Sequence, residues 1–278
     1  MLAVCPRIAL AQKTLLSAAS LRQPRLRPTA ALFQCTARQP SPQHSLQTRA
    51  FVQSARVNLP LRSPYRNIQD GLVEEKHDKW GWVIYRCFYE DDSAWERFKQ
   101  IITQQTRAQI LKSDAPEALN SLEWTFVSDR PTLENIPMNQ LRSLFTDWAA
   151  TAIQTEQPRA TDHILQLSGP RYNYFIQVDE HALNSVVSPT ERDPLRSGLV
   201  KFVDARWRPL AELLPGQIEE RKPEDELEAI DGCTDENVGW MLISPGIIGA
   251  DFYEASYSFS FMDAWYVYYV RPPERVWN

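Results

Sequence analysis

The sequence predicts an α/β (α+β) sandwich, in which helices pack on one mixed sheet around a ferredoxin-like core with additions. Two observations predict this class. Short aromatic and β-branched runs alternate with segments of helical apolar spacing between residues 79 and 278. The first part of this alternation reads strand, helix, strand, helix, strand, which is typical of crossover connections within one sheet. No internal period indicates a repeat protein.

The first predicted strand covers residues 80–89, which read WGWVIYRCFY. It is apolar on both faces, and this pattern is typical of a strand that is covered on both sides. Asp91, Asp92 and Ser93 provide N-cap chemistry after this strand, and Glu96 is placed for a capping box if Ser93 is the cap. A helix is expected to follow to about Lys112, because apolar side chains recur there at helical spacing.

The remaining elements continue the same alternation. Helical apolar spacing and turn residues predict helices over 138–153, 179–187 and 245–257. Runs of aromatic and β-branched residues predict five further strands, which are expected at 122–127, 172–178, 199–205, 238–244 and 264–270. Together with the first strand and helix, these elements are expected to form a single domain over residues 79–278.

The charge distribution divides the chain into a basic leader and an acidic body. Ten of the 30 Lys and Arg residues precede the first acidic residue, Asp70. The remaining chain has 20 Lys and Arg against 35 Asp and Glu, a formal charge of −15. A Ser- and Arg-rich leader without acidic residues is typical of a mitochondrial presequence, because the membrane potential draws positive charge toward the matrix. We therefore expect residues 1–58 to be a disordered presequence and the protein to reside in the mitochondrial matrix.

A short motif in the leader predicts where the presequence is removed. Residues 49–54, RAFVQS, resemble the two-step mitochondrial processing site, in which cleavage two residues after an arginine is followed by removal of an octapeptide. Cleavage is expected after Ala50 and then after Asn58, which leaves residues 59–78 as a linker. A secretory signal peptide is disfavoured, because polar residues interrupt its apolar core. The leader could also be a disordered basic tail or the product of a misassigned start codon.

Composition restricts the partners of the body. Its formal charge of −15 argues against nucleic-acid binding, which needs basic residues between stacking aromatics. No run reaches the roughly 18 apolar residues of a membrane span, so no transmembrane segment is expected. Only Cys87 and Cys233 occur in the body, and two cysteines do not make a disulfide framework. The nine acidic residues within 217–237 predict a mobile, solvated loop.

The sequence offers four weak candidates for residues of a catalytic or binding site. No P-loop, dinucleotide-binding, zinc-protease or nucleophile-elbow motif occurs, and no Cys or His spacing predicts a metal site, so neither cofactor nor metal is expected. Asp179 and His181 follow a predicted strand, where binding residues often lie, although a helix N-terminus explains the acidic residue equally well. Arg86 lies on an apolar strand and needs an anionic ligand, an internal ion pair or access to solvent. Tyr172 is the fourth candidate.

Six phrases of the body resemble a group of filamentous-fungal proteins. They are WGWVIYRC (80–87), DDSAW (91–95), LEWTFVSDR (122–130), RYNYFIQVDE (171–180), VGWMLIS (238–244) and AWYVYYVRPPE (264–274). The resemblance covers residues 78–275 and implies a fungal source and a single module. This group has no known activity, so the resemblance implies no catalytic residues.

Two classes of function follow from these observations. The missing catalytic motifs and the acidic segment 217–237 favour a non-catalytic binding or assembly module, with a protein or a small molecule as its partner. The second class is a small-molecule enzyme with a site near Arg86 and the strand end at 178–181. A deep pocket that gathers two or more candidate side chains would favour the enzyme. A flat, exposed apolar patch would favour the binding module.

Overall fold

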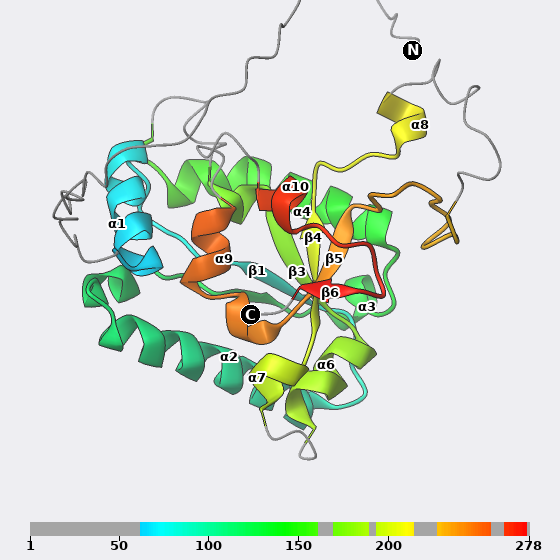
Figure 1. Cartoon of the computed structure of the whole chain (residues 1–278), viewed down its shortest axis with the longest axis horizontal. Coiled ribbons are helices and arrows are strands. Elements are labelled where there is room, and N and C mark those ends of the chain that lie inside the picture. Colours follow the sequence, from blue (N-terminus) through cyan, green and yellow to red (C-terminus); the bar gives the residue numbers. More distant parts are fainter. Residues whose placement is uncertain (1–61, 161–168, 189–192, 214–226, 257–263, 277–278) are drawn as a thin grey trace, which may run out of the picture. The chain divides into compact units, whose positions relative to one another are not determined.

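The computed structural model describes residues 62–160, 169–188, 193–213, 227–256 and 264–276 (Figure 1). The chain divides into two units, Met1–Arg56 and Val57–Asn278, and all described residues belong to the second unit. The expected presequence and both of its cleavage sites lie outside the described residues, so they stay predictions.

One mixed six-stranded sheet organises the second unit, with the strand order β2-β1-β3-β4-β5-β6 (Figure 1). The strands are β1 (Val83–Arg86), β2 (Thr125–Val127), β3 (Tyr174–Val178), β4 (Val200–Asp204), β5 (Trp240–Ile243) and β6 (Arg275–Val276). β1 runs parallel to both of its neighbours, whereas β4 runs antiparallel to both β3 and β5. The predicted α/β class is confirmed. The ferredoxin-like detail is not, because β2, β1 and β3 form a parallel group.

Two long helices connect the first three strands and cover opposite faces of the sheet. α2 (Asp92–Lys112) links β1 to β2, and α4 (Met138–Glu156) links β2 to β3. Buried residues of α2 pack with Trp82 and Ile84 on one face, and those of α4 pack with Tyr85 on the other. Because both faces are covered, all four residues of β1 are buried, as the apolar run predicts.

The structure selects one of the three possible N-caps of α2. Asp91 is the N-cap, and its carboxylate accepts a hydrogen bond from the backbone N–H of Ala94 at 2.8 Å. Ser93 Oγ donates to the same carboxylate at 2.7 Å. Of the three residues that the sequence offers as caps, the N-cap is therefore Asp91, and the capping box from Ser93 to Glu96 does not form the helix start.

The expectation of a linker over residues 59–78 is wrong for most of its length. Residues Pro64–Glu75 form helix α1. Ser63 is its N-cap, and the Ser63 side chain accepts a hydrogen bond from the backbone N–H of Arg66. Tyr65, Ile68 and Leu72 lie on one buried face of this helix and join the same core as α2. Their spacing of three and four residues is helical, but polar residues between them hide it in a short segment.

The predicted strand over residues 264–270 is also wrong. Residues Ala264–Tyr268 form helix α10, and the edge strand β6 comes after it. Trp265 is buried against Tyr174 and Phe202, with ring centroids 5.9 and 6.1 Å away, and Tyr269 packs against Trp265. Residues four apart therefore share one side, which is helical spacing. A continuous aromatic run does not reveal this, because its side chains are apolar on every face.

Shorter helices complete the described part of the chain. They are η1 (Pro116–Asn120), α3 (Arg130–Leu133), η2 (Pro170–Tyr172), α6 (Glu180–Val187), α7 (Pro194–Ser197), α8 (Leu210–Leu213), η5 (Pro245–Ile247) and α9 (Ala250–Ala255). Buried residues of α6 and α9 belong to the same core cluster as those of α2. In the part of the chain that the structure describes, no helix has the length and apolarity needed to span a bilayer.

The acidic segment 217–237 is described only from residue 227 onward. Ile230 and Cys233 pair through their backbones, with N–O distances of 3.0 and 2.9 Å. Arg271 donates from Nη2 to the carbonyl of Glu228 at 2.6 Å and from Nε to that of Asp235 at 3.1 Å. The described part of the segment is thus held by hydrogen bonds to the C-terminal region, and its mobility stays a prediction.

Candidate functional site

The four residues predicted as site candidates do not converge on one point. Arg86 ends β1 and pairs in register with Val178 of β3, so Arg86 and Asp179 lie at the same edge of the sheet. His181 is exposed in the first turn of α6 near this edge. Tyr172 precedes β3 and therefore lies at its opposite end. The structure brings together two of the strand-end candidates and separates the tyrosine from them.

Arg86 has partners within the fold. Its side chain is 6% exposed, and Nη2 lies 2.6 Å from Oδ1 of Asp92. Nε donates to the carbonyl of Phe88 at 2.8 Å, and the guanidinium lies 4.4 Å from the ring centroid of Tyr89. An internal ion pair, one of the three explanations that the sequence allows, therefore accounts for this buried cation.

Asp179 and Tyr172 also have structural partners. The Asp179 carboxylate caps α6 by accepting from the N–H of Ala182 at 2.9 Å, and it pairs with Lys201 at 2.9 Å. Burial opposes ionisation, but these two contacts hold the pKa of Asp179 below its usual value. Tyr172 is buried; its hydroxyl donates to Glu156 at 2.9 Å and accepts from Gln157 at 2.7 Å. These residues stabilise the fold, and no cavity is needed to explain them.

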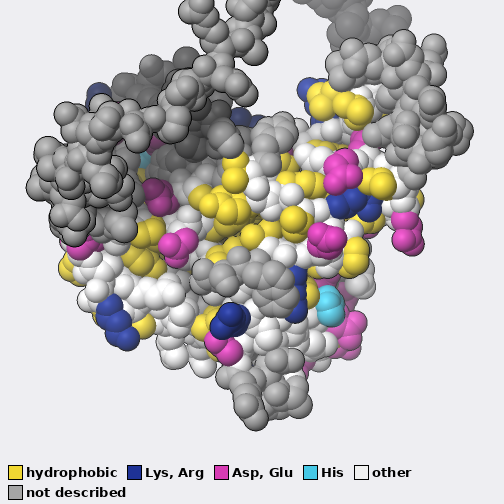
Figure 2. Space-filling model, in the orientation of Figure 1, with side chains coloured by type: hydrophobic (Ala, Val, Ile, Leu, Met, Phe, Trp, Pro, Cys, Tyr) yellow, Lys and Arg dark blue, Asp and Glu magenta, His cyan; other side chains and the backbone are white. Residues whose placement is uncertain are grey.

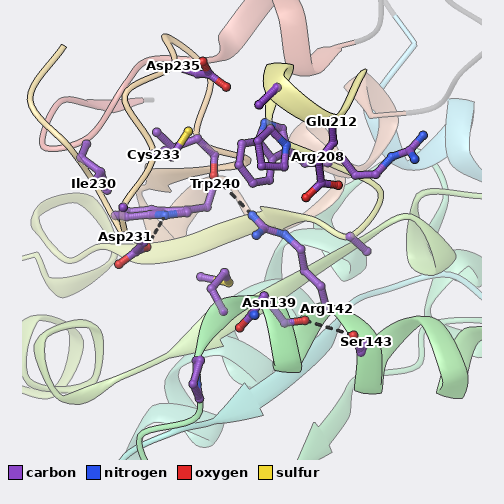
Figure 3. Close-up of a pocket in the computed structure, with 18 of the residues that line it drawn as sticks. Asn139, Arg142, Ser143, Arg208, Glu212, Ile230, Asp231, Cys233, Asp235 and Trp240 are labelled. Atoms are coloured by element: carbon purple, nitrogen blue, oxygen red, sulfur yellow. Dashed lines mark hydrogen bonds between the residues drawn. The ribbon is translucent and has the colours of Figure 1, made fainter. Parts of the chain in front are cut away.

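A cavity of about 920 Å³ opens beside the first turns of α4 (Figure 3). α4 forms one wall, and residues 205–212 and 230–240 form the others. The polar and aromatic side chains of the lining include Arg142 and Asp147 of α4, Trp207 and Glu212 after β4, and Trp240 in β5. Ligand pockets in proteins commonly have volumes of about 300–1,000 Å³, so this cavity is large enough for a small organic molecule.

Arg142 is the most unusual side chain of the cavity. Its Nε donates to the carbonyl of Asp204 at 3.0 Å, and its Nη2 donates to the carbonyl of Gly239 at 2.9 Å. The guanidinium carbon lies 4.7 Å from the ring centroid of Trp207. Among the described residues, no carboxylate forms an ion pair with Arg142, and its Nη1 group has no hydrogen-bond acceptor. One edge of the guanidinium is therefore available to a ligand.

The charge of Arg142 is poorly compensated by the protein. Burial lowers the pKa of this guanidinium to about 10, although the more distant carboxylates of Asp204 and Asp231 oppose the shift. Arginine nonetheless stays protonated at neutral pH. Carbonyl dipoles rather than a carboxylate balance the charge, so an anionic group that reached Nη1 would gain a charge-assisted hydrogen bond.

Gly239 permits Trp207 and Arg142 to pack closely against the backbone. Its φ of +77° is one that L side chains rarely adopt. A Cβ atom at this position would lie 2.4 Å from the ring of Trp207 and 2.5 Å from Nη2 of Arg142. The stacked pair of Arg142 and Trp207 can therefore rest on the backbone only where the residue is glycine.

Two indole side chains give the cavity rigid apolar surface. Nε1 of Trp207 donates to the carbonyl of Asn237 at 3.0 Å, and Nε1 of Trp240 donates to Oδ2 of Asp231 at 3.0 Å. Figure 3 shows the Trp240–Asp231 hydrogen bond. On the Trp240 ring lies the ammonium of Lys201, 4.8 Å from the centroid. Because their N–H groups are bonded, both rings are fixed in orientation.

No family model, no curated protein and no solved structure matches the chain. The resemblance to filamentous-fungal proteins therefore stays a prediction.

Three observations describe the nucleophilic, basic and metal-binding groups of the described cavity lining. This lining contains no histidine. Burial raises the pKa of the Cys233 thiol, and the nearby Asp235 carboxylate raises it further, so this thiol is protonated at neutral pH. Ser143 Oγ donates to the backbone carbonyl of Asn139 at 3.2 Å rather than to a base (Figure 3). Within the described ranges, no group of three His, Cys, Asp or Glu residues is placed to hold a metal ion.

Sequence reasoning missed this cavity, although one signal for it exists. Gly239 lies inside the predicted strand 238–244, and a glycine within a strand pattern indicates that another group approaches the backbone closely. Arg142 and Trp207 carry no comparable signal, because they are 65 residues apart in sequence and meet only in the folded chain.

Helix α10 has two exposed apolar side chains among its described residues. Val267 and Tyr268 of α10 are 49% and 43% exposed. Apolar side chains are visible in the upper centre of the face in Figure 2, where α10 and α9 lie in Figure 1. Scattered exposed apolar residues are normal in proteins, so these two side chains do not define a docking surface.

Proposed function

We propose that this protein is a non-catalytic binding protein of the mitochondrial matrix, and that its small organic ligand occupies the cavity beside α4. The observation that carries the proposal is the free Nη1 edge of Arg142 in a cavity of about 920 Å³. A cationic edge beside two fixed indole rings, Trp207 and Trp240, combines the few polar groups and the apolar walls that ligand pockets share.

Ligand binding is tested by titration of the purified full chain. Thermal unfolding is recorded in the presence of a library of water-soluble carboxylates and phosphates, and each compound that raises the Tm is confirmed by calorimetry. Because a ligand that binds only the folded state stabilises it, we expect at least one compound to raise the Tm by several degrees.

Two arginine substitutions connect such binding to the cavity. Arg142→Met removes the charge and is expected to weaken binding by about tenfold or more. The matched control, Arg130→Met, removes an exposed arginine outside the cavity lining and should leave the affinity unchanged. Failure of every compound to bind, or equal affinity of the Arg142→Met variant, would contradict the proposal. Chemical conversion of a bound compound would contradict its non-catalytic part.

The mitochondrial part of the proposal rests on the leader. Cleavage after Asn58 would leave α1 intact, since this helix begins at Pro64. The full chain with a C-terminal tag is expected to accumulate in mitochondria with Leu59 as its first residue. Arg49→Ala should block the first cleavage, because this arginine lies two residues before the cut. Fractionation and N-terminal sequencing provide the measurement, and a cytosolic, secreted or uncut product would refute this part.

A further inference from the structure

Charged side chains other than Arg142 also line the cavity, and they are Asp147, Arg208, Glu212, Asp231 and Asp235. Figure 3 shows the Glu212 carboxylate of α8 directed into the cavity, on the side toward which Arg142 extends from α4. Glu212 is exposed, and neither an ion pair nor a side-chain hydrogen bond joins it to any described residue. The cavity thus contains a cationic edge and an anionic side chain that do not neutralise each other.

The charges of Arg142 and Glu212 restrict the ligands that fit beside these two side chains. A carboxylate on Arg142 Nη1 would be attracted there, but a ligand with only negative charge would also meet the like charge of Glu212. A ligand with only positive charge would meet the guanidinium. Like charges brought together at a binding site are unfavourable, whereas complementary potentials provide specificity. A molecule with one group of each sign complements both Arg142 and Glu212.

The apolar side chains of the cavity walls favour a ligand that has an apolar group. Trp207 stacks on Arg142 with one face, and the rim beyond it includes Ile230 and Val238. The Asp231 carboxylate accepts from Trp240 Nε1, so it holds this ring in place at the same wall. An aromatic or aliphatic group attached beside the charged groups of a ligand would bury apolar area against these side chains.

From these contacts we infer that the ligand is a zwitterion with an apolar side group, such as an aromatic α-amino acid. Its carboxylate accepts from Arg142 Nη1, its ammonium lies at Glu212, and its apolar group packs on Trp207 and Trp240. This inference rests on the proposed ligand-binding function and adds to it the chemical class of the ligand.

Three probes that share a phenyl ring test the contribution of each charged group to binding. Phenylalanine carries both charged groups, 3-phenylpropionate lacks the ammonium, and phenethylamine lacks the carboxylate. Calorimetric titration of the full chain is expected to show phenylalanine binding about tenfold or more tightly than either singly charged probe. Equal or tighter binding of 3-phenylpropionate would overturn the zwitterion in favour of a simple anion. Tightest binding of phenethylamine would overturn it in favour of a cation.

A conservative substitution tests whether the ammonium of the ligand contacts Glu212. Glu212→Gln retains the size of the side chain and removes its charge, so phenylalanine should lose about tenfold in affinity while 3-phenylpropionate is unaffected or gains. Glu74→Gln, at an exposed position of α1, is the matched control and should change neither affinity. Unchanged selectivity in the Glu212→Gln variant would overturn the assignment. If none of the probes binds while a library compound does, this inference fails and the proposed function stands; if nothing binds, both fail.

Discussion

Replacing Arg171 with methionine is expected to lower the free energy of unfolding by about 3–5 kcal/mol, because it leaves Glu156 without its cation in a largely buried position. The Arg171 side chain is fully buried and forms a two-pronged ion pair with Glu156, with Nε–Oε2 and Nη2–Oε1 distances of 2.8 and 2.9 Å. Its remaining hydrogens reach the carbonyl of Glu123 at 2.9 Å and Oγ1 of Thr125 at 2.7 Å. One guanidinium therefore connects α4, β2 and the start of β3.

Urea unfolding followed by tryptophan fluorescence measures this loss. Arg130→Met is the matched control, because Arg130 pairs with Glu90 and Glu134 at positions that are 54%, 66% and 33% exposed. Exposed ion pairs contribute about 0–1 kcal/mol, so the control should unfold almost as the wild type does. If the two variants lost the same small amount of stability, Arg171 would not have the structural role assigned to it.

The same ion pair predicts the acid sensitivity of the fold. Burial raises the pKa of Glu156, but hydrogen bonds and the charge of Arg171 more than offset this and hold the pKa below its usual value of 4.5. A carboxyl whose pKa is lowered by folding stabilises the protein above its unfolded-state pKa, and this stabilisation disappears as the pH falls through the folded-state value. The wild type should therefore lose stability below a pH of about 4.5, and Arg171→Met should lose less over the same range.

Replacing Gly239 with alanine is expected to disrupt both the fold and the cavity. An L residue in the left-handed region costs about 1–2 kcal/mol, and the φ of Gly239 is +77°. The added Cβ would also overlap the Trp207 ring and Arg142 Nη2, and overpacking of this kind typically costs about 1–3 kcal/mol. Relief of the overlap requires Trp207 and Arg142 to move, so the affinity for any ligand of the cavity should fall as well.

Gly232 provides a matched control for the backbone contribution. Its φ is +82°, but nothing lies within 4 Å of where its Cβ would be. Gly232→Ala should therefore show only the conformational cost of about 1–2 kcal/mol. Because Gly232 also lines the cavity, the stabilities of the two variants, measured by urea unfolding, separate strain from overlap, and calorimetric titration is used for Gly239→Ala alone. Equal losses of stability, with ligand affinity retained in Gly239→Ala, would show that close approach at Gly239 is not required.

Most of the elements between residues 80 and 244 are predictable from the sequence, because each carries its own periodicity. The helix at 138–153 appears as α4, and the strands at 172–178 and 199–205 appear as β3 and β4. Periodicity fails where the pattern is short or uniformly apolar. Residues 64–75 have three apolar side chains at helical spacing among polar ones, and residues 264–270 are aromatic on nearly every side.

The candidate site was much less predictable. Arg86 and Asp179 attract attention in the sequence because charged residues stand beside apolar strands, but Asp92 and Lys201 compensate them in the fold. Arg142 is one of many polar residues on a helix, and nothing local distinguishes it. Its importance comes from what it lacks, a carboxylate partner among the described residues, and partners are a property of the folded chain.

Local sequence information is enough to establish the α/β class, the N-cap chemistry at Asp179 and the contrast between a basic leader and an acidic body. These features depend on the spacing and charge of residues that are neighbours in the chain. The strand order, the helical state of residues 264–268 and the cavity beside α4 emerge only in the folded molecule. Each of these depends on which apolar faces bury one another, and that choice is made by contacts between residues far apart in the chain.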